Sequence, residues 1–131
     1  MKILENVKKK LEIIEMRTII AGSRSITNYE EVKKYLYVYR EDISKVLCGC
    51  AKGVDEIRKQ FAYEYTIPIE YYPADWNKYG KRAGYIRNIE MAKNADFLIA
   101  IWDGKSKGTK NMIDIATKAG LKVITITWGK E

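Results

Sequence analysis

Apolar residues follow two alternating patterns along the chain from about position 16 onward. Continuous apolar runs of a few residues are typical of buried strands, whereas apolar residues that recur every three or four positions mark one face of a helix. The runs predict five strands, at 18–21, 45–48, 69–72, 96–102 and 123–127. Because helical patterns separate consecutive runs, the chain is expected to alternate between strand and helix.

Local signals support the helices between these strands. The helix markers are Val32, Tyr35, Leu36 and Tyr39, then Val54, Ile57, Phe61 and Tyr65, then a weaker pattern over 82–94, and finally Met112, Ile115, Ala116 and Ala119. Thr27 with Glu30, or Asn28 with Glu31, offers a capping box for the first of these helices. Gly120 suits the position just past the end of the last one.

Alternating strands and helices predict a parallel sheet with helices on both faces, joined by right-handed crossovers. The fold class is therefore α/β: a Rossmann-like, three-layer α/β/α domain over 16–131 with a five-stranded, mainly parallel sheet. Residues 1–15 form a separate unit, an amphipathic helix with an apolar stripe opposite a run of lysines. Packing of this helix on its own domain is slightly favoured over a dimer contact, and a membrane contact ranks third.

Composition limits the reactions and ligands that can be expected of this chain. The 131 residues fit one domain and contain no histidine, which removes the commonest general base. Cys48 and Cys50 lie in or near a buried strand, so we expect two reduced thiols, and no metal site is predicted. No bilayer-spanning run or signal peptide is seen, so a cytoplasmic protein is expected. The net charge of +7 favours an anionic partner without choosing among phosphate compounds, nucleic acid and membrane.

The carboxyl ends of the predicted strands are much richer in glycine and polar residues than the amino ends. They read GSRS at 22–25, GCAKGVD at 49–55, PADWN at 73–77 and DGKSKGT at 103–109. Ligands of open α/β sheets bind outside the carboxyl ends of the strands. This edge of the sheet is therefore the expected functional site.

Each candidate at this edge has a structural alternative. Gly108 and Thr109 fall where the last helix begins, which suits a phosphate cradle, although Thr109 alone reads equally as the N-cap of the helix. Arg24 fits a phosphate or carboxylate, and we favour that role about two to one over a surface salt bridge. Asp55, beside Gly53, caps its helix, hydrogen-bonds a ribose hydroxyl or polarises a water; capping is favoured on residue type alone.

Basic and aromatic residues interleave after the third strand. The basic members are Lys78, Lys81, Arg82 and Arg87, and the aromatic members are Trp76, Tyr79 and Tyr85. This pattern suits phosphate contacts with base stacking, and a solvated helix face with core aromatics fits it equally well. Two familiar signatures are missing: the first turn lacks G-x-G-x-x-G, and Ile99 stands where a Walker A motif requires glycine.

Taken together, these segments resemble a known family. The runs AGSRS, GCAKGVDEI, YYPADWNKYGKRAGYIRNIEM and GTKNMIDIATKAGLKVI are similar to YspA-like, YpsA-related members of the SLOG superfamily. That superfamily is a Rossmann-like group that includes the DNA-processing protein DprA and the LOG phosphoribohydrolases. The resemblance implies a ligand pocket made by Gly22, Ser23, Arg24, Gly53, Asp55, Asp75, Trp76, Arg87, Asn88, Gly108 and Thr109. It also implies that Arg87 meets a phosphate and that Asn88 fixes the loop or the ligand.

The resemblance implies that the protein senses or sequesters a nucleotide or nucleotide-derived ligand, with no cofactor. The first alternative is a hydrolase of an N-glycosidic or phosphate bond, with Asp55 and Asp75 as catalytic candidates. Met112 stands where the phosphoribohydrolases carry a glutamate, which favours binding over their chemistry. Single-stranded nucleic acid ranks last, because the basic residues are scattered along the chain. A homo-oligomer is also expected, since the 1–15 helix offers an additional apolar face.

Overall fold

The computed structural model describes residues 16–23, 25–49 and 55–129, with the side chains of residues 55 and 56 left out. The strands are β1 (Met16–Gly22), β2 (Ile43–Cys48), β3 (Ile69–Tyr71), β4 (Phe97–Trp102) and β5 (Lys122–Thr127). The α-helices are α2 (Tyr29–Leu36), α3 (Asp55–Glu64), α4 (Trp76–Tyr79), α5 (Ala83–Lys93) and α6 (Lys107–Lys118). Two 3-10 turns, η1 (Tyr37–Tyr39) and η2 (Gly80–Arg82), extend α2 and join α4 to α5.

The five strands form one sheet in the order β3-β2-β1-β4-β5, and every pairing is parallel. The predicted Rossmann-like α/β fold is therefore confirmed. The chain first builds outward from β1 to β3, then returns to the other side of β1 with β4. The strand order reverses between β1 and β4, and such switch points are where open α/β sheets form ligand crevices.

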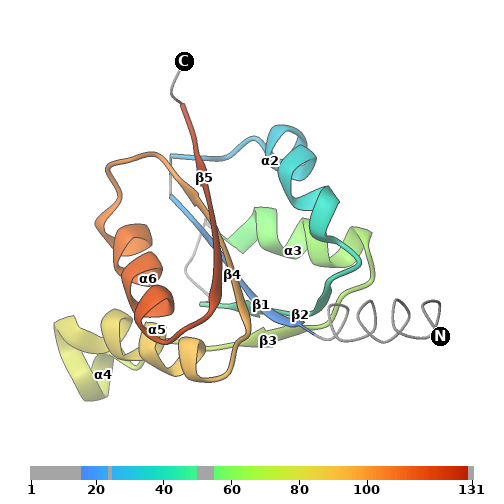
Figure 1. The fold of residues 1–131 in the computed structure, drawn as a ribbon. Helices are drawn as coiled ribbons and strands as arrows, with labels where there is room; N and C mark the ends of the chain where they lie inside the picture. Colours follow the sequence, from blue (N-terminus) through green and yellow to red (C-terminus); the bar gives the residue numbers. More distant parts are fainter. Residues whose placement is uncertain (1–15, 24, 50–54, 130–131) are drawn as a thin grey trace.

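Helices cover both faces of the sheet, as Figure 1 shows: α2 and α3 lie on one face, and α5 and α6 on the other. Alternate strand residues supply the two cores, because successive side chains point to opposite faces. Ile20, Val46 and Ile99 pack with α2 and α3, whereas Ile19, Leu47 and Leu98 pack with α5 and α6. The first four residues of β4 are fully buried on both sides, as expected for the strand predicted to be the deepest.

The helix ends follow the sequence signals with two exceptions. Asn28 caps α2 by accepting a hydrogen bond from the Glu31 amide at 3.2 Å, and Gly120 has the positive φ of 84° that ends α6. The reading of Thr109 as an N-cap is wrong. Ser106 holds that position, because α6 begins at Lys107. The short helix α4 was not predicted either; a single turn has too few residues to show helical periodicity.

Several predictions fall on residues outside the described ones, including the 1–15 helix and Cys50. Cys48 is a buried thiol in β2. Within the described segments, no helix has the length and apolar character needed to cross a membrane.

Candidate functional site

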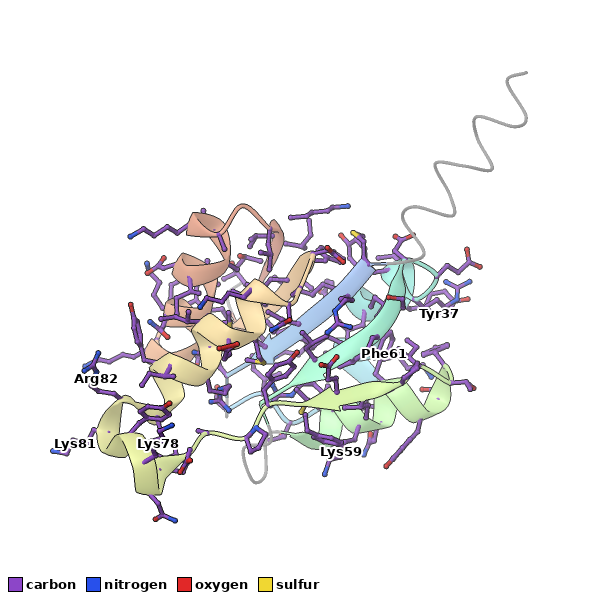
Figure 2. The ribbon with its side chains drawn as sticks, turned by 90° about the horizontal axis from the view of Figure 1, so that it is seen from below. Tyr37, Lys59, Phe61, Lys78, Lys81 and Arg82 are labelled. Atoms are coloured by element: carbon purple, nitrogen blue, oxygen red, sulfur yellow. The ribbon has the colours of Figure 1, made fainter. Side chains whose placement is uncertain are left out.

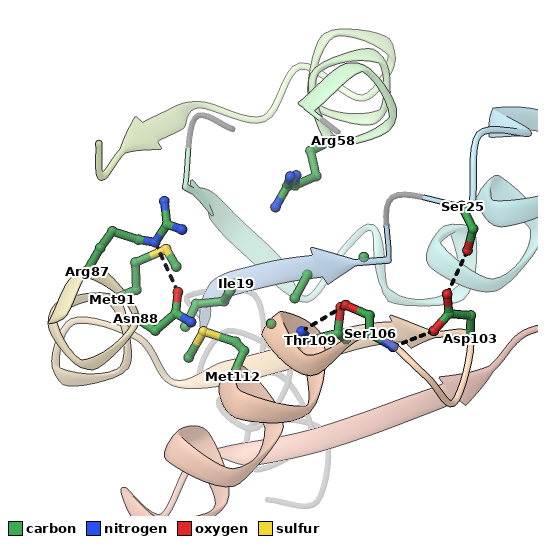
Figure 3. A pocket seen from close by; sticks show the side chains of 13 residues that line it. Ile19, Ser25, Arg58, Arg87, Asn88, Met91, Asp103, Ser106, Thr109 and Met112 are labelled. Carbon is green, nitrogen blue, oxygen red and sulfur yellow. Dashed lines mark hydrogen bonds between the residues drawn. The ribbon is translucent and has the colours of Figure 1, made fainter. Parts of the chain in front are cut away.

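A cavity of about 430 Å³ opens at the switch point, over the carboxyl end of β1 and between α5 and α6. We call it the switch-point cavity. Figure 3 shows side chains from α3, α5 and α6 converging on it. Its lining residues are Ile19, Ala21, Gly22, Ser25, Arg58, Arg87, Asn88, Met91, Asp103, Ser106, Gly108, Thr109 and Met112.

Arg58 of α3 brings a positive charge to the cavity from a nearly enclosed position. The residue is 8% exposed, and its Nη1 donates to the carbonyl oxygen of Ile20 in β1 at 2.9 Å. A guanidinium carries five N–H donors in a planar fork, so one bond to the backbone fixes its position while its charge still faces the cavity. A buried arginine beside an open cavity is suited to an anionic ligand.

Arg87 of α5 brings a second positive charge and also joins the ends of two strands. Its Nη1 donates to the carbonyl oxygens of Gly49, at 2.5 Å, and Tyr72, at 3.4 Å. A Cβ at Gly49 would lie 2.5 Å from the same Nη1, so a side chain there would displace the guanidinium from its present position. Arg87 Nε donates to the Asn88 side-chain oxygen at 3.0 Å, and Asn88 in turn donates to Asn111 of α6 at 3.0 Å.

The first turn of α6 forms a further wall of the cavity. Ser106 caps it by accepting from the Thr109 amide at 3.3 Å, and the Ser106 carbonyl accepts from the Lys110 amide at 3.2 Å. The amides of Lys107 and Gly108 belong to the helix start, where backbone N–H groups have no acceptor within the helix. A Cβ at Gly108 would meet no protein atom within 4 Å. An anion can therefore approach this backbone closely, toward the positive end of the helix dipole.

Asp103 is the carboxylate among the described lining residues, and it is held by the protein itself. One oxygen accepts from the amides of Ser106 and Lys105, both at 2.8 Å, and the other accepts from the Ser25 hydroxyl at 2.7 Å. These bonds, the Ser106 amide first, lower the pKa of Asp103 to about 2. Asp103 is consequently ionised near neutral pH and is a poor proton donor and a weak base.

The structure places five of the residues in the predicted pocket in the walls of the switch-point cavity. They are Gly22, Arg87, Asn88, Gly108 and Thr109. Ser23 lies beside them but is 1% exposed; its hydroxyl accepts from the Asp103 amide at 3.1 Å and lies 3.4 Å from the Thr109 hydroxyl. Ser23 therefore ties the ends of β1, β4 and α6 together.

Two predicted residues lie elsewhere in the described structure. Asp75 caps α4 by accepting from the Lys78 amide at 3.1 Å, and Trp76, the first residue of α4, is 60% exposed. Neither residue lines the switch-point cavity. Arg24, Gly53 and the side chain of Asp55 fall outside the described residues.

Sequence reasoning missed Arg58, the most enclosed charge at the cavity. A signal was present, because Arg58 lies four positions after Val54 and four before Ala62, on the apolar stripe of α3. A charged residue at a core position of a helix is rare unless it is partnered. Ser25, Asp103 and Ser106 were noted only as polar strand ends, since their mutual hydrogen bonds depend on the three-dimensional loop.

The described residues contain no cluster of three or more histidine, cysteine or acidic side chains that would hold a metal ion. What the site offers chemically is positive charge from Arg58 and Arg87 and backbone donors from α6, together with the thioethers of Met91 and Met112. This arrangement suits a ligand with an anionic group and an apolar part.

Comparison with known proteins finds one relative in sequence and one similar fold. No protein-family model matches the chain. The chain is 39% identical over 85 residues to the Gene 61 protein of Mycobacterium phage D29, which covers 60% of this chain and 68% of that protein. The chain belongs to the family of this phage protein.

The fold is also similar to that of DNA processing protein A (DprA) from Streptococcus pneumoniae. The TM-score is 0.70 at 15% sequence identity, and the match covers 91% of this chain. The chain spans about half of the DprA chain, 53% of its length. At this identity the likeness bears on the fold alone, and it agrees with the Rossmann-like order of the sheet.

Proposed function

We propose that this protein binds a phosphate-bearing, nucleotide-derived ligand in the switch-point cavity. The observation that carries the proposal is the convergence of Arg58, Arg87 and the first turn of α6 on one cavity at the switch point of the sheet. Two guanidinium groups and a helix start are the groups that proteins use to hold phosphate. The net charge of +7 strengthens the attraction for an anion at long range.

The cavity's size and mixed lining support a small organic phosphate over an inorganic ion alone. Its volume of about 430 Å³ is far larger than an inorganic phosphate needs, and small-molecule sites commonly measure about 300–1,000 Å³. Apolar side chains of Ile19, Met91 and Met112 also line the cavity. A sugar or base attached to the phosphate has apolar surface for these side chains to cover.

Binding without turnover is favoured over hydrolysis. Asp103 is ionised and fully engaged, and Met112 supplies a thioether that carries no proton to transfer. Asp75 caps α4 outside the cavity, which leaves Asp55 as the carboxylate candidate for the hydrolase alternative. Long incubation of a bound nucleotide followed by chromatography separates the two: recovery of intact ligand supports a sensor, and product that disappears in Asp55→Ala supports a hydrolase.

Membership in the YspA-like group of the SLOG superfamily is part of the same proposal. The PADW and RN motifs of this sequence and the fold shared with DprA support it. Single-stranded nucleic acid is the second candidate ligand, because DprA is a DNA processing protein and this chain is strongly basic. A nucleic-acid ligand predicts an affinity that falls steeply with salt.

A thermal-shift screen tests the proposal, with nucleoside monophosphates, cyclic dinucleotides, NAD and ADP-ribose as ligands. A ligand at 100 times its dissociation constant stabilises the fold by about 2.7 kcal/mol. Gly108→Leu is the matched variant, because Gly108 lines the cavity and a Cβ at this position would meet no protein atom within 4 Å. We expect a shift in the wild type that is lost in Gly108→Leu. Equal shifts in both proteins, or none with any ligand, would contradict the proposal.

The remaining proposals concern the whole chain. We place the protein in the cytoplasm, with residues 1–15 as a helix preceding a domain over 16–131, and we expect that helix to support a homo-oligomer. Light scattering of the full chain tests the last point. A single species larger than a monomer supports it, and a monomer at high concentration refutes it.

A further inference from the structure

A second cavity lies on the other side of Arg87. Its volume is about 240 Å³, and it is formed where β3 ends and the chain turns through α4 into α5. Three tyrosines, Tyr71, Tyr72 and Tyr79, line it together with Asp75 and Glu90. We call it the aromatic cavity. Arg87 is the lining residue that the two cavities share, so the cavities adjoin at this side chain.

The aromatic walls of this cavity are exposed to an unusual degree. Tyr71 is 46% exposed and Tyr79 is 40% exposed, so neither ring is needed to fill the core. The Tyr72 hydroxyl donates to Glu70 at 2.8 Å, which fixes the third ring at the back. Exposed aromatic faces at a cavity are the surfaces on which nucleobases stack.

The charges of the aromatic cavity differ from those of the switch-point cavity. Asp75 and Glu90 add two carboxylates to the shared Arg87 in its lining, whereas the switch-point cavity adds Arg58, Asp103 and a helix start to it. Carboxylates repel a phosphate and accept hydrogen bonds from the amino groups of bases, as acidic side chains do from cytosine. The two cavities are therefore complementary to two different parts of one nucleotide.

Besides Arg87 in its lining, the aromatic cavity has positive side chains near Tyr71 and Tyr79, which we call its rim. The Lys78 ammonium lies 5.2 Å from the centre of the Tyr79 ring, and the Lys59 ammonium lies 6.0 Å from that of Tyr71. Figure 2 shows Lys78, Lys81 and Arg82 around the projecting turn of α4 and η2. Such a rim suits a backbone phosphate that passes the cavity.

We propose that the aromatic cavity is the nucleobase subsite of the ligand whose phosphate occupies the switch-point cavity. This inference rests on the proposed function of the first cavity. The ligand class is a nucleoside phosphate, with the phosphate between Arg58 and α6, the sugar passing Arg87, and the base against Tyr79. Such a unit is available from a free nucleotide or from the end of a nucleic-acid strand.

Calorimetric titration of AMP and of ribose 5-phosphate into the full chain tests the subsite, because the two compounds share the phosphate and the sugar but differ in the base. We expect AMP to bind about tenfold more tightly or better, the effect of one base stacked on an aromatic side chain. Tyr79→Ala should abolish most of this difference and leave the affinity for ribose 5-phosphate unchanged. Tyr79→Phe, which keeps the ring, should retain it.

Tyr63→Ala is the matched control, because Tyr63 of α3 is 73% exposed and lines neither cavity. The inference is overturned if AMP and ribose 5-phosphate bind the wild type equally, or if Tyr79→Ala behaves like Tyr63→Ala. Those results leave the phosphate site standing. If neither compound binds the wild type at all, the inference fails, and the proposed function fails with it when no other ligand of the thermal-shift screen binds either.

A third titration, with a 5′-phosphorylated hexadeoxyadenylate, separates the two sources of the ligand. Tighter binding than AMP, with an affinity that falls steeply as salt is raised, assigns the subsite to a strand end. An affinity equal to or below that of AMP assigns it to a free nucleotide. In either case Tyr79→Ala must lose as much affinity for the strand as it loses for AMP. A strand that binds Tyr79→Ala as tightly as it binds the wild type contradicts the base subsite.

Discussion

The two faces of the sheet are covered in similar ways but filled differently. On the α2/α3 face, the core includes Phe61 and Phe97, and Ala62 is its one alanine among the described residues. On the α5/α6 face, four alanines are part of the buried cluster: Ala21, Ala92, Ala100 and Ala116. The second face encloses the switch-point cavity of about 430 Å³, whereas a pocket at the first face, lined by Ile20, Ile26, Ile57 and Ile101, measures about 20 Å³.

The difference teaches how one sheet serves both stability and binding. Protein interiors are packed to the density of organic crystals, so a cavity requires either small side chains or a deliberate gap between elements. Ile19, Ala21, Met91 and Met112 of this cluster line the cavity, whereas Leu47 and Leu98 do not. We infer that the α2/α3 face contributes more of the folding free energy, and that the α5/α6 face gives up packing for a ligand site.

Large-to-small substitutions on the two faces give the largest expected effect. Phe61→Ala, at a fully buried position on the α2/α3 face, should lower the free energy of unfolding by about 3–5 kcal/mol. Met112→Ala is also at a buried position but enlarges an existing cavity, so its cost should lie near the lower end of the usual range, about 2 kcal/mol. Urea denaturation measures both. Equal losses would show that the two faces are packed alike.

The hydrogen bonds from Arg87 to the ends of β2 and β3, which we call the Arg87 clamp, should give the next largest effect on the free energy of unfolding. In Gly49→Ala the new Cβ would lie 2.5 Å from Arg87 Nη1 and 2.9 Å from Cζ, so the guanidinium must leave the carbonyl oxygens of Gly49 and Tyr72. We expect a loss of about 1–3 kcal/mol in unfolding free energy, with a smaller ligand-induced shift. Gly22→Ala is the control for stability, because its Cβ has 4.0 Å to the nearest carbonyl. Wild-type stability in Gly49→Ala would disprove the clamp.

Gly108→Ala should have opposite effects on folding and on binding. Alanine is favoured over glycine in a helix by about 1 kcal/mol, and no protein atom opposes the added Cβ, so the unliganded protein should become slightly more stable. The same methyl group should weaken ligand binding, because it stands where the phosphate approaches the backbone. Melting curves with and without ligand measure both effects in one series. A more stable protein with undiminished ligand binding would place the ligand elsewhere.

Acidification should give the smallest effect, a fall in the free energy of unfolding as Asp103 becomes protonated. The folded pKa of Asp103, about 2, lies below its ordinary value of 3.8, so the ionised form stabilises the fold above about pH 4. That contribution is lost as the pH falls from about 4 toward 2. Asp103→Asn does not titrate, so the stability advantage of the wild type over this variant should shrink across that window. A constant difference between the two proteins from pH 5 to pH 2 would contradict the hydrogen-bonded carboxylate.

The fold was predictable because its signals are local and repeated. Each strand is an apolar run, and caps such as Asn28 and Gly120 lie where the sequence indicates them. The sequence predicted two regions less well: α4, which is short, and the start of α6, whose cap is recognised only together with the helix that it precedes. One-turn α4 leaves no periodicity, and the capping role of Ser106 is only apparent once α6 is known to begin at Lys107.

The candidate site was partly predictable for the same reason. Gly22, Gly108 and Arg87 were found from strand ends and motifs, because position at the edge of a parallel sheet follows from the order of elements. Arg58 was missed because its place at the cavity depends on how α3 packs on β1. Trp76 and Asp75 follow a strand end as well, but β3 stands two strands from the switch point, so its loop does not reach the cavity.

A titration followed by amide NMR tests the central claim most directly, because this chain of 131 residues is small enough for complete backbone assignment. AMP is added to the ¹⁵N-labelled protein, and the amide signals of Lys107 and Gly108 are followed. The account predicts large, saturable shifts at these two amides, together with shifts at residues that line the switch-point cavity. Shifts confined to exposed lysines, with the Gly108 amide unmoved at saturation, would contradict it.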